Sequence, residues 1–487
     1  MEPKIHFSHY FDVDPDLLDE YGAFNISLIN DLPLFIDPFL LFNSTNPEYQ
    51  HLHESIIQYL RFLRDRASYV QANPGLVAAW YTFPEFKQTW FGFSGVGNKG
   101  RGLGRDFAFA LQRNLHTVFS DFGNERVTRG SHLEKLTLIR DGVGKDKISD
   151  FTTNLIKAYL LEYTQTFAQA HLNPRTRKRI RIPRVIFNYS TETWEARTFE
   201  LPVIQSDFVV LTPKNMLTKD DTWINKDDLI NSYDQVVQSL PNEVLRAQLN
   251  NYLLKILPPN STPRERRRAI PQVLQSFPQL IEYYILYKEE HGYHALSISE
   301  ERVAWSQHIF VDQARELALN LFHNTPFYQV RGDTLTEARA RLTFFKDVVE
   351  NKGGWQIFYV DGQPIRREPD LHILYRLTWF ATPSDVSREV NDGRGPADFK
   401  ISRGSQDKSI VEFKLANNSQ LKRNLQHQVE IYQKASDAHK ALKAIIYFTQ
   451  DELERVTNIL RGLGLEGSPD IVLIDARSDN KPSASKA

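Results

Sequence analysis

The chain has 487 residues, a formal net charge of −1 and no cysteine, and 41% of its residues are hydrophobic. A chain of this length exceeds one ordinary hydrophobic core, so we expect more than one domain. The absence of cysteine excludes disulfides, thiolate metal sites and cysteine nucleophiles. No apolar run has the length of a signal peptide or a membrane span, which predicts a cytoplasmic protein without membrane contact.

Residues 1–258 have the pattern of a mixed α/β region. Apolar residues at helical spacing predict helices, and runs of β-branched and aromatic residues predict strands. The helices are expected over 51–67, 150–170 and within 227–257, and the strands over 184–189 and 206–212.

The proline-rich stretch at 258–263 indicates a linker, because proline fixes φ and removes a hydrogen-bond donor. Residues 263–352 then read as a helical segment, with apolar side chains at helical spacing in each part. The last residues, 478–487, have the composition of a disordered tail.

Residues 353–477 show a regular order of elements, and we expect a separate domain there. A strand and turn open it, and a helix, three short strands, a helix, a strand, a helix and a last strand follow. The expected ranges are 354–362, 368–380, 385–390, 397–402, 409–415, 418–435, 443–449, 451–464 and 470–476. The predicted fold class is thus a multidomain α/β protein with a C-terminal αβββαβ core.

Two of these strands carry charged residues that favour metal chemistry. Alternate side chains of a strand share a face, so Glu412 and Lys414 lie opposite Val411 and Phe413. If the strands pair as a hairpin, Asp398 reaches the same face as Glu412, and we expect their carboxylates within about 6 Å. Paired carboxylates suit a hard cation such as Mg²⁺, and a nearby lysine can orient a water or offset phosphate charge.

Pro396-Ala397-Asp398, with Glu412-Phe413-Lys414 starting 14 residues after Asp398, resembles the motif of the PD-(D/E)XK nuclease superfamily, also called restriction-endonuclease-like. The order of elements in 353–477 resembles the core of that family. The resemblance implies that Asp398, Glu412 and the carbonyl of Phe413 hold the metal, and that Lys414 lies next to the attacking water.

Further residues match the same family. Many members carry a glutamate on the helix before the first strand, and Glu368 matches it as a catalytic and metal-binding residue; Glu389 is a rival for that role. An exonuclease-like branch has Gln-x-x-x-Tyr on the following helix, which Gln428 and Tyr432 match, with Gln428 as the catalytic residue.

The resemblance implies an Mg²⁺-dependent nuclease that hydrolyses phosphodiester bonds, with Mn²⁺ able to substitute, acting on DNA in preference to RNA. The large region before it suits a prokaryotic defence (anti-phage or restriction) role, and a homo-oligomer or a partner protein is compatible with it. The alternative is a catalytically inactive nucleic-acid-binding or sensor module that retains the nuclease fold. A third hypothesis gives residues 1–258 a nucleotide-dependent activity of their own.

Two basic runs are candidates for phosphate contact. Arg177, Lys178 and Arg179 belong to the densest run, 175–184, and Arg266 and Arg267 belong to the run 264–268. A solvated strand edge guarded by charge explains the first run equally well.

Two weaker patterns have structural explanations too. The glycine-rich stretch 92–106 offers backbone N–H groups to a phosphate, but it matches no P-loop spacing and a loop explains it. His132, Glu134 and the aspartates up to Asp150 could form a second metal site, or only a turn and a helix cap.

Overall fold

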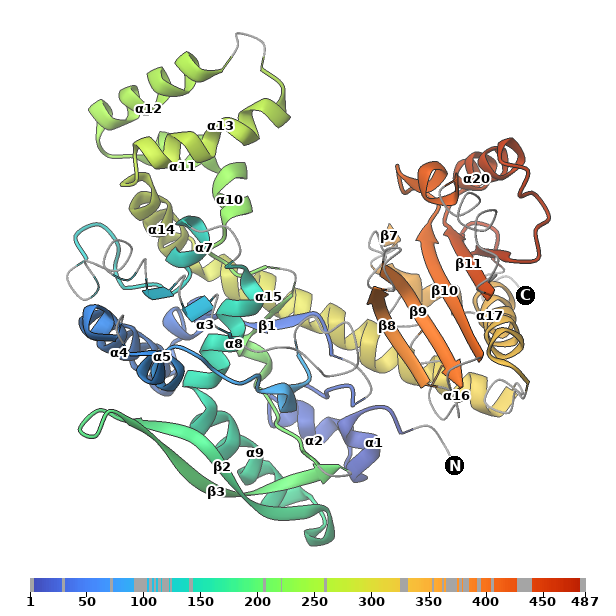
Figure 1. Cartoon of the computed structure of the whole chain (residues 1–487), viewed down its shortest axis with the longest axis horizontal. Coiled ribbons are helices and arrows are strands. Elements are labelled where there is room, and N and C mark those ends of the chain that lie inside the picture. Colours follow the sequence, from blue (N-terminus) through green and yellow to red (C-terminus); the bar gives the residue numbers. More distant parts are fainter. Residues whose placement is uncertain are drawn as a thin grey trace.

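The computed structural model describes residues 4–28, 31–70, 73–91, 103–104, 107–108, 111–112, 115, 122, 125–139, 143–204, 207–219, 221–257, 261–324, 332–352, 354–360, 363–364, 375, 379, 385–391, 396–403, 407–426 and 440–481. Figure 1 shows a body with a helical arm on one side and a sheet-containing lobe on the other, joined by a long helix. We call these parts the N-terminal body (α1 to β5), the helical arm (α10 to α14), the connecting helix (α15 to α16) and the C-terminal lobe (α17 to β12). The predicted mixed α/β class is confirmed. Within the described residues, no helix has both the length and the apolar composition needed to cross a membrane.

The longest helix of the N-terminal body, α4, packs one face against the core. Ile56, Leu60 and Leu63 are all fully buried at helical spacing on that face. The elements are α1 (Phe7–Phe11), α2 (Pro15–Glu20), β1 (Leu34–Ile36), α3 (Pro38–Phe42), α4 (Pro47–Val70), α5 (Pro74–Trp80), η1 (Lys87–Thr89), α7 (Lys135–Ile139), α8 (Lys145–Leu155), α9 (Lys157–His171), η2 (Pro174–Thr176), β2 (Arg177–Asn188), β3 (Thr193–Ile204), β4 (Asp207–Phe208), η3 (Lys214–Met216) and β5 (Leu217–Lys219).

The structure corrects two predicted elements of this body. The helix expected over 150–170 is two helices, because Ile156 leaves the helical conformation with ψ near 12° and separates α8 from α9. The strand expected over 206–212 is limited to β4, since the N–H of Val210 bonds to the carbonyl of Gln88 and not to a strand ladder. β2 and β3 form a long antiparallel hairpin next to α9 (Figure 1).

The helical arm consists of α10 (Lys226–Asn231), α11 (Tyr233–Ser239), α12 (Glu243–Ile256), α13 (Pro263–Ser276) and α14 (Leu280–Glu290). The hydrophobic core of the arm also includes Phe39 and Leu40 of α3, Leu138 of α7 and Ala295 of α15. Leu229 and Leu249, which precede position 258, pack in one cluster with Ile270 and Tyr284, which follow it. The predicted linker therefore joins two helices, α12 and α13, that contact one another.

The connecting helix contains a π-helical stretch between α15 (Gly292–Gln307) and α16 (Ala314–Asn324). This stretch, His308–Gln313, shifts the usual bonding pattern of the helix. The ring Nε2 of His6 lies 3.0 Å from the carbonyl oxygen of Phe310 inside it. Burial lowers the pKa of His6 to about 3, so its ring is neutral at neutral pH and can donate one N–H there. The N-terminal segment is thereby attached to the connecting helix.

The C-terminal lobe is a five-stranded mixed sheet in the order β12-β11-β10-β9-β8. β8, β9 and β10 are antiparallel neighbours, and β11 and β12 continue the sheet in parallel with β10. Its elements are α17 (Thr334–Asn351), η6 (Gly354–Phe358), β6 (Tyr359–Val360), β7 (Gln363–Pro364), β8 (Asp385–Asn391), β9 (Pro396–Arg403), β10 (Asp407–Leu415), β11 (Lys440–Tyr447), α20 (Gln450–Gly462) and β12 (Ile471–Asp475). The strands predicted for β8 to β12 are confirmed with small shifts at their ends. The strand expected over 354–362 is wrong in its first half, which is the 3₁₀ helix η6.

Helices lie against both faces of this sheet. On one face, the ring of Phe413 lies 6.2 Å from that of Phe345 on α17 and 4.3 Å from that of Tyr375. On the other face, Ile445 of β11 packs in a cluster with Leu425 from the helical segment 421–426 and with residues of α20. This second cluster includes no described residue of β8 or β9.

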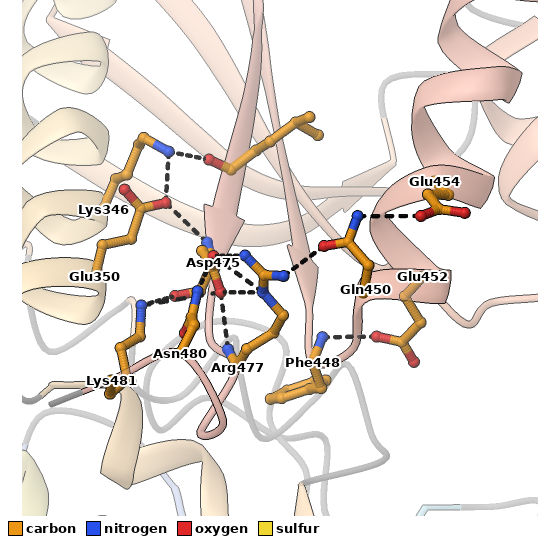
Figure 2. Close-up of polar contacts among 11 residues, drawn as sticks. Lys346, Glu350, Phe448, Gln450, Glu452, Glu454, Asp475, Arg477, Asn480 and Lys481 are labelled. Carbon is orange, nitrogen blue, oxygen red and sulfur yellow. Dashed lines mark hydrogen bonds and ion pairs between the residues drawn. The ribbon is translucent and has the colours of Figure 1, made fainter. Parts of the chain in front are cut away.

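Polar contacts hold the end of β12 in place (Figure 2). The carboxylate of Asp475 accepts hydrogen bonds from the Arg477 guanidinium at 2.7–3.1 Å and from the Asn480 amide at 2.8 Å. The backbone N–H of Asp475 donates to Glu350 of α17 at 2.8 Å. Burial acts to raise the pKa of Asp475, but these bonds outweigh it and lower the pKa to about 2. This cluster, the β12 clamp, ties the sheet edge to α17.

Candidate active site in the C-terminal lobe

Strand β10 separates apolar from charged side chains as its sequence predicts. Val411 and Phe413 are fully buried, and Leu415 is 3% exposed. Glu412 and Lys414 have intermediate exposure and lie on the opposite face of the strand. Glu412 thus belongs to the face that does not pack against α17.

The backbone register places positions 389, 398 and 412 next to one another. Phe399 of β9 is opposite Val411 of β10, so the same register continued by one residue brings position 398 opposite Glu412. β8 pairs with β9 on either side of the same point, which brings position 389 beside 398. Directly opposite positions share a face of the sheet, so the three positions form a row across three strands.

The side chains of Asp398 and Glu389 lie outside the described part of the chain. The separation of the Asp398 and Glu412 carboxylates therefore stays a prediction, although the register supports it. Glu368, Gln428 and Tyr432 lie entirely outside the described residues. The helix predicted over 418–435 is described only over 421–426, and the exonuclease-like match stays untested.

Lys443 of β11 extends this row, and its role was not predicted. It stands opposite Glu412 in the parallel register. Its Nζ lies 3.4 Å from Glu412 Oε2, and the side chains of Lys443 and Glu412 are 6% and 17% exposed. The same ammonium lies 3.5 Å from the carbonyl oxygen of Asn424. The sequence predicts a strand over 443–449, but it does not mark Lys443 as the partner of Glu412.

Lys414 lies two residues beyond Glu412 on the same face of β10. It stands opposite Ile445 of β11, which is fully buried under the helical segment 421–426. Lys414 therefore lies between the acidic row and the apolar cluster on this face. This placement is compatible with the predicted role of Lys414 beside a reacting water.

The basic run of β2 is partly neutralised within the N-terminal body. Arg177 Nη1 donates to the carbonyl of Ala168 at 3.1 Å, and Nε lies 3.5 Å from Glu200. Lys178 and Arg179 are exposed and lie on the hairpin, so they stay candidates for phosphate contact.

One arginine of the second basic run, 264–268, also forms an ion pair within the fold. Arg267 pairs with Asp227 at 2.6 Å, while the side chain of Arg266 lies outside the described part. Glu265 completes a capping box with Thr262 at the start of α13, which places a negative charge at this helix end.

The two weaker sequence patterns gain no ligand site from the structure. Most of the stretch 92–106, including the glycines at 95, 97, 100 and 102, lies outside the described residues, as does Asp141. His132 lies 2.8 Å from Glu289 and does not meet Glu134 in a shared site. Among the side chains that are described, no cluster of three or more histidines or acids is arranged to hold a metal ion.

A buried carboxyl pair in the N-terminal body was not predicted. Asp37 caps α3 by accepting the N–H of Phe39 at 3.0 Å, and it also accepts the N–H of Trp223 at 2.6 Å. Glu134 is fully buried beside Asp37. Burial and the Asp37 charge raise the pKa of Glu134 well above its ordinary value, which favours its protonated form.

A cavity of about 190 Å³ adjoins this pair and is lined by Asp37, Trp223, Asp228 and Lys288 among others. Lys288 donates to Asp228 at 2.8 Å and lies over the Trp223 ring at 3.6 Å. Tyr284 donates to the same carboxylate oxygen at 2.8 Å. The charges beside this cavity are thus engaged with one another.

Comparisons with known families divide the chain at similar places. Residues 12–225 match a family described as a domain of unknown function, DUF8370, and residues 334–450 match another, DUF8371. The first match covers most of the N-terminal body, and the second runs from α17 to the start of α20. No curated protein and no solved structure matches the chain. The two family matches therefore give the chain two recurrent domains without assigning either a function.

Proposed function

We propose that the C-terminal lobe is an Mg²⁺-dependent nuclease of the restriction-endonuclease-like kind, and that DNA is its substrate. The feature that supports this proposal is the register of β8, β9 and β10, which, continued by one residue, brings position 398 beside Glu412 and position 389 beside 398, with Lys414 on the Glu412 face of β10. Acids on neighbouring strands with a lysine beside them are suited to metal-assisted phosphodiester hydrolysis.

The arrangement of the lobe supports the fold assignment. Three antiparallel strands, β8 to β10, are followed by two strands that continue the sheet in parallel. α17 packs on one face, while α20 and the helical segment 421–426 pack on the other. The strands follow the predicted order, while the helix predicted over 368–380 lies almost wholly outside the described residues and that over 418–435 is described only over 421–426.

The chemistry of the residues present fits a hard divalent cation. Glu412 supplies carboxylate oxygens, the ligands that hard cations prefer, and its side chain is 17% exposed. Glu412 and Asp398 would hold the metal, which supplies Lewis-acid activation of water and of the phosphate when it is bound. Lys414 would orient the attacking water and offset the charge of the phosphate.

One observation favours the alternative of an inactive nucleic-acid-binding module. Glu412 has a partner of opposite charge without any metal, and a folded lobe could keep this pair for structure alone. An enzyme and a binding module share the fold and differ only in turnover.

A cleavage assay separates these two functions. Purified protein is incubated with Mg²⁺ or Mn²⁺ and with linear duplex DNA, circular DNA, single-stranded DNA or RNA. We expect cleavage of DNA that disappears in Glu412→Gln and in Lys414→Ala, with circular dichroism showing that both variants fold. Lys408→Met is the matched control, since it removes a lysine from the same strand, and it should retain cleavage. Binding without metal-dependent cleavage would support the inactive module.

The proposal extends to a biological role in defence against phage. A separate N-terminal body and helical arm before the nuclease lobe are compatible with recognition and cleavage in different parts of one chain, as in a defence system. A partner protein or a second copy of the chain can supply the trigger. Protection of cells against phage by the wild type, but not by Glu412→Gln, would support this role.

A further inference from the structure

Lys443 stands in a position that the pattern of β11 otherwise fills with apolar side chains. Ile445, two residues on and on the same face, is fully buried, and Lys443 itself is only 5% exposed. A buried lysine is rare unless its charge is paired, because removing an ammonium group from water is costly. Its charged partner among the described contacts is Glu412.

The pair is a loose one compared with other buried pairs of the lobe. Glu337 and Arg341 on α17 are both fully buried, and Arg341 bonds to Glu337 through two nitrogens at 2.9 and 3.0 Å. Glu412 Oε2 and Lys443 Nζ lie 3.4 Å apart, which is longer than a close charge-assisted hydrogen bond. A buried ion pair of this kind adds little stability over an apolar residue of the same size. Stability alone therefore does not explain a lysine at this position.

We propose that Lys443 is an internal counter-ion of Glu412 that a divalent cation must displace, so that this lysine sets the metal affinity of the site. The inference rests on the proposed metal-binding role of Glu412. Without metal, the ammonium offsets the Glu412 charge and holds its carboxylate on the sheet face. When a divalent ion binds, two positive charges compete for one carboxylate, and the repulsion between them weakens metal binding. Lys443 is thus a positioning residue and makes no bond to the reacting atoms.

The test measures metal binding directly and does not depend on turnover. Mn²⁺ is titrated into the full-length protein, and the signal of unbound Mn²⁺ in electron paramagnetic resonance reports the dissociation constant. In Lys443→Met the side chain stays unbranched, becomes one atom shorter and loses its charge, and we expect Mn²⁺ to bind about tenfold more tightly, a change of about 1.4 kcal/mol. Lys443→Gln gives the same comparison if the methionine variant fails to fold.

The matched control is Lys408→Met. Lys408 lies on β10 on the same face as Glu412, four residues away and thus about 13 Å along the strand. The Lys408→Met substitution removes the same charge, but at a distance from Glu412 where salt screening is strong. The Mn²⁺ affinity of this variant should therefore change by less than about twofold.

The outcomes distinguish the inference from the function on which it rests. Tighter Mn²⁺ binding in Lys443→Met but not in Lys408→Met supports the counter-ion role. Unchanged or weaker binding in Lys443→Met, with metal binding by the wild type, overturns it while the nuclease proposal stands. A wild-type protein that binds no Mn²⁺ at this site, as judged against Glu412→Gln, refutes both.

Discussion

The carboxyl pair Asp37–Glu134 gives the N-terminal body a stability that depends on pH. Asp37 accepts two backbone N–H groups, at 3.0 Å and 2.6 Å, and therefore carries the charge of the pair. Glu134 is fully buried, and because burial and the Asp37 charge raise its pKa, we expect it to hold a proton in the folded state. In the unfolded chain Glu134 loses this proton near its ordinary pKa. The test is Glu134→Gln, whose amide can donate to Asp37 at every pH.

The size of the effect follows from proton counting. The pKa of Glu134 is raised in the folded state. Its contribution to the free energy of unfolding is therefore fully present below the pKa of the unfolded chain, and it is lost as pH rises toward the pKa of the folded state. As long as Glu134 stays protonated, the folded state binds one proton more than the unfolded state, and stability falls by about 1.4 kcal/mol per pH unit. Burial also raises the pKa of Asp37 to about 6, so the comparison should be made above pH 6.5. Above pH 6.5, and for as long as Glu134 stays protonated, Glu134→Gln should gain about 1.4 kcal/mol over the wild type for each pH unit.

Hydrogen exchange measured by mass spectrometry can follow this change locally, because peptides from α3 and α7 report the opening of this part of the body. The ratio of protection factors between variant and wild type cancels the intrinsic effect of pH on exchange. We expect this ratio to rise about tenfold per pH unit. Glu54→Gln, a change of an exposed residue on α4, should give a constant ratio. A constant ratio for Glu134→Gln as well would mean that Glu134 is not protonated in the folded protein.

Three further changes test other parts of the structure. Asp475→Asn should destabilise the C-terminal lobe by about 1–2 kcal/mol at pH 7 in urea unfolding. Because the pKa of Asp475 is lowered to about 2, the stabilisation by its carboxylate is lost as pH falls from about 4 toward 2, and the difference between variant and wild type should shrink over that range. Phe413→Ala removes a fully buried ring and should cost the lobe about 3–5 kcal/mol in the same assay. If the β2–β3 hairpin contacts phosphates, changing Lys178 and Arg179 to alanine should flatten the slope of log affinity against log salt by about 1–2 units, and an unchanged slope would exclude that contact.

The strands of the C-terminal lobe could be predicted because each carries its own signal. Alternation of apolar and charged residues in β9 and β10 needs no knowledge of the rest of the chain, and it correctly placed Glu412 and Lys414 opposite Phe413. β9 and β10 pair antiparallel as the sequence predicts, and the placement of Asp398 beside Glu412 stays a prediction.

Contacts between distant segments could not be predicted in this way. Lys443 meets Glu412 only because β11 lies parallel to β10, in a register that strand periodicity does not specify. Glu134 meets Asp37 across the N-terminal body, and each residue alone reads as an ordinary turn or cap residue. The π-helical stretch 308–313 also escaped prediction, because its apolar pattern is that of an ordinary helix.

The difference between local patterns and contacts of distant segments also indicates which charged residues to test first. Arg177 is in the densest basic run, yet it bonds to Ala168 and lies near Glu200, so its charge is committed to the fold. Lys443 lies in a mostly apolar strand, yet it lies against the carboxylate on which the proposed chemistry depends. Local charge density is therefore a poor guide to function in this chain, because folding pairs most charges with neighbours. A charge in a position that packing would fill with an apolar residue is the more informative one, since the fold alone gives no reason to keep it.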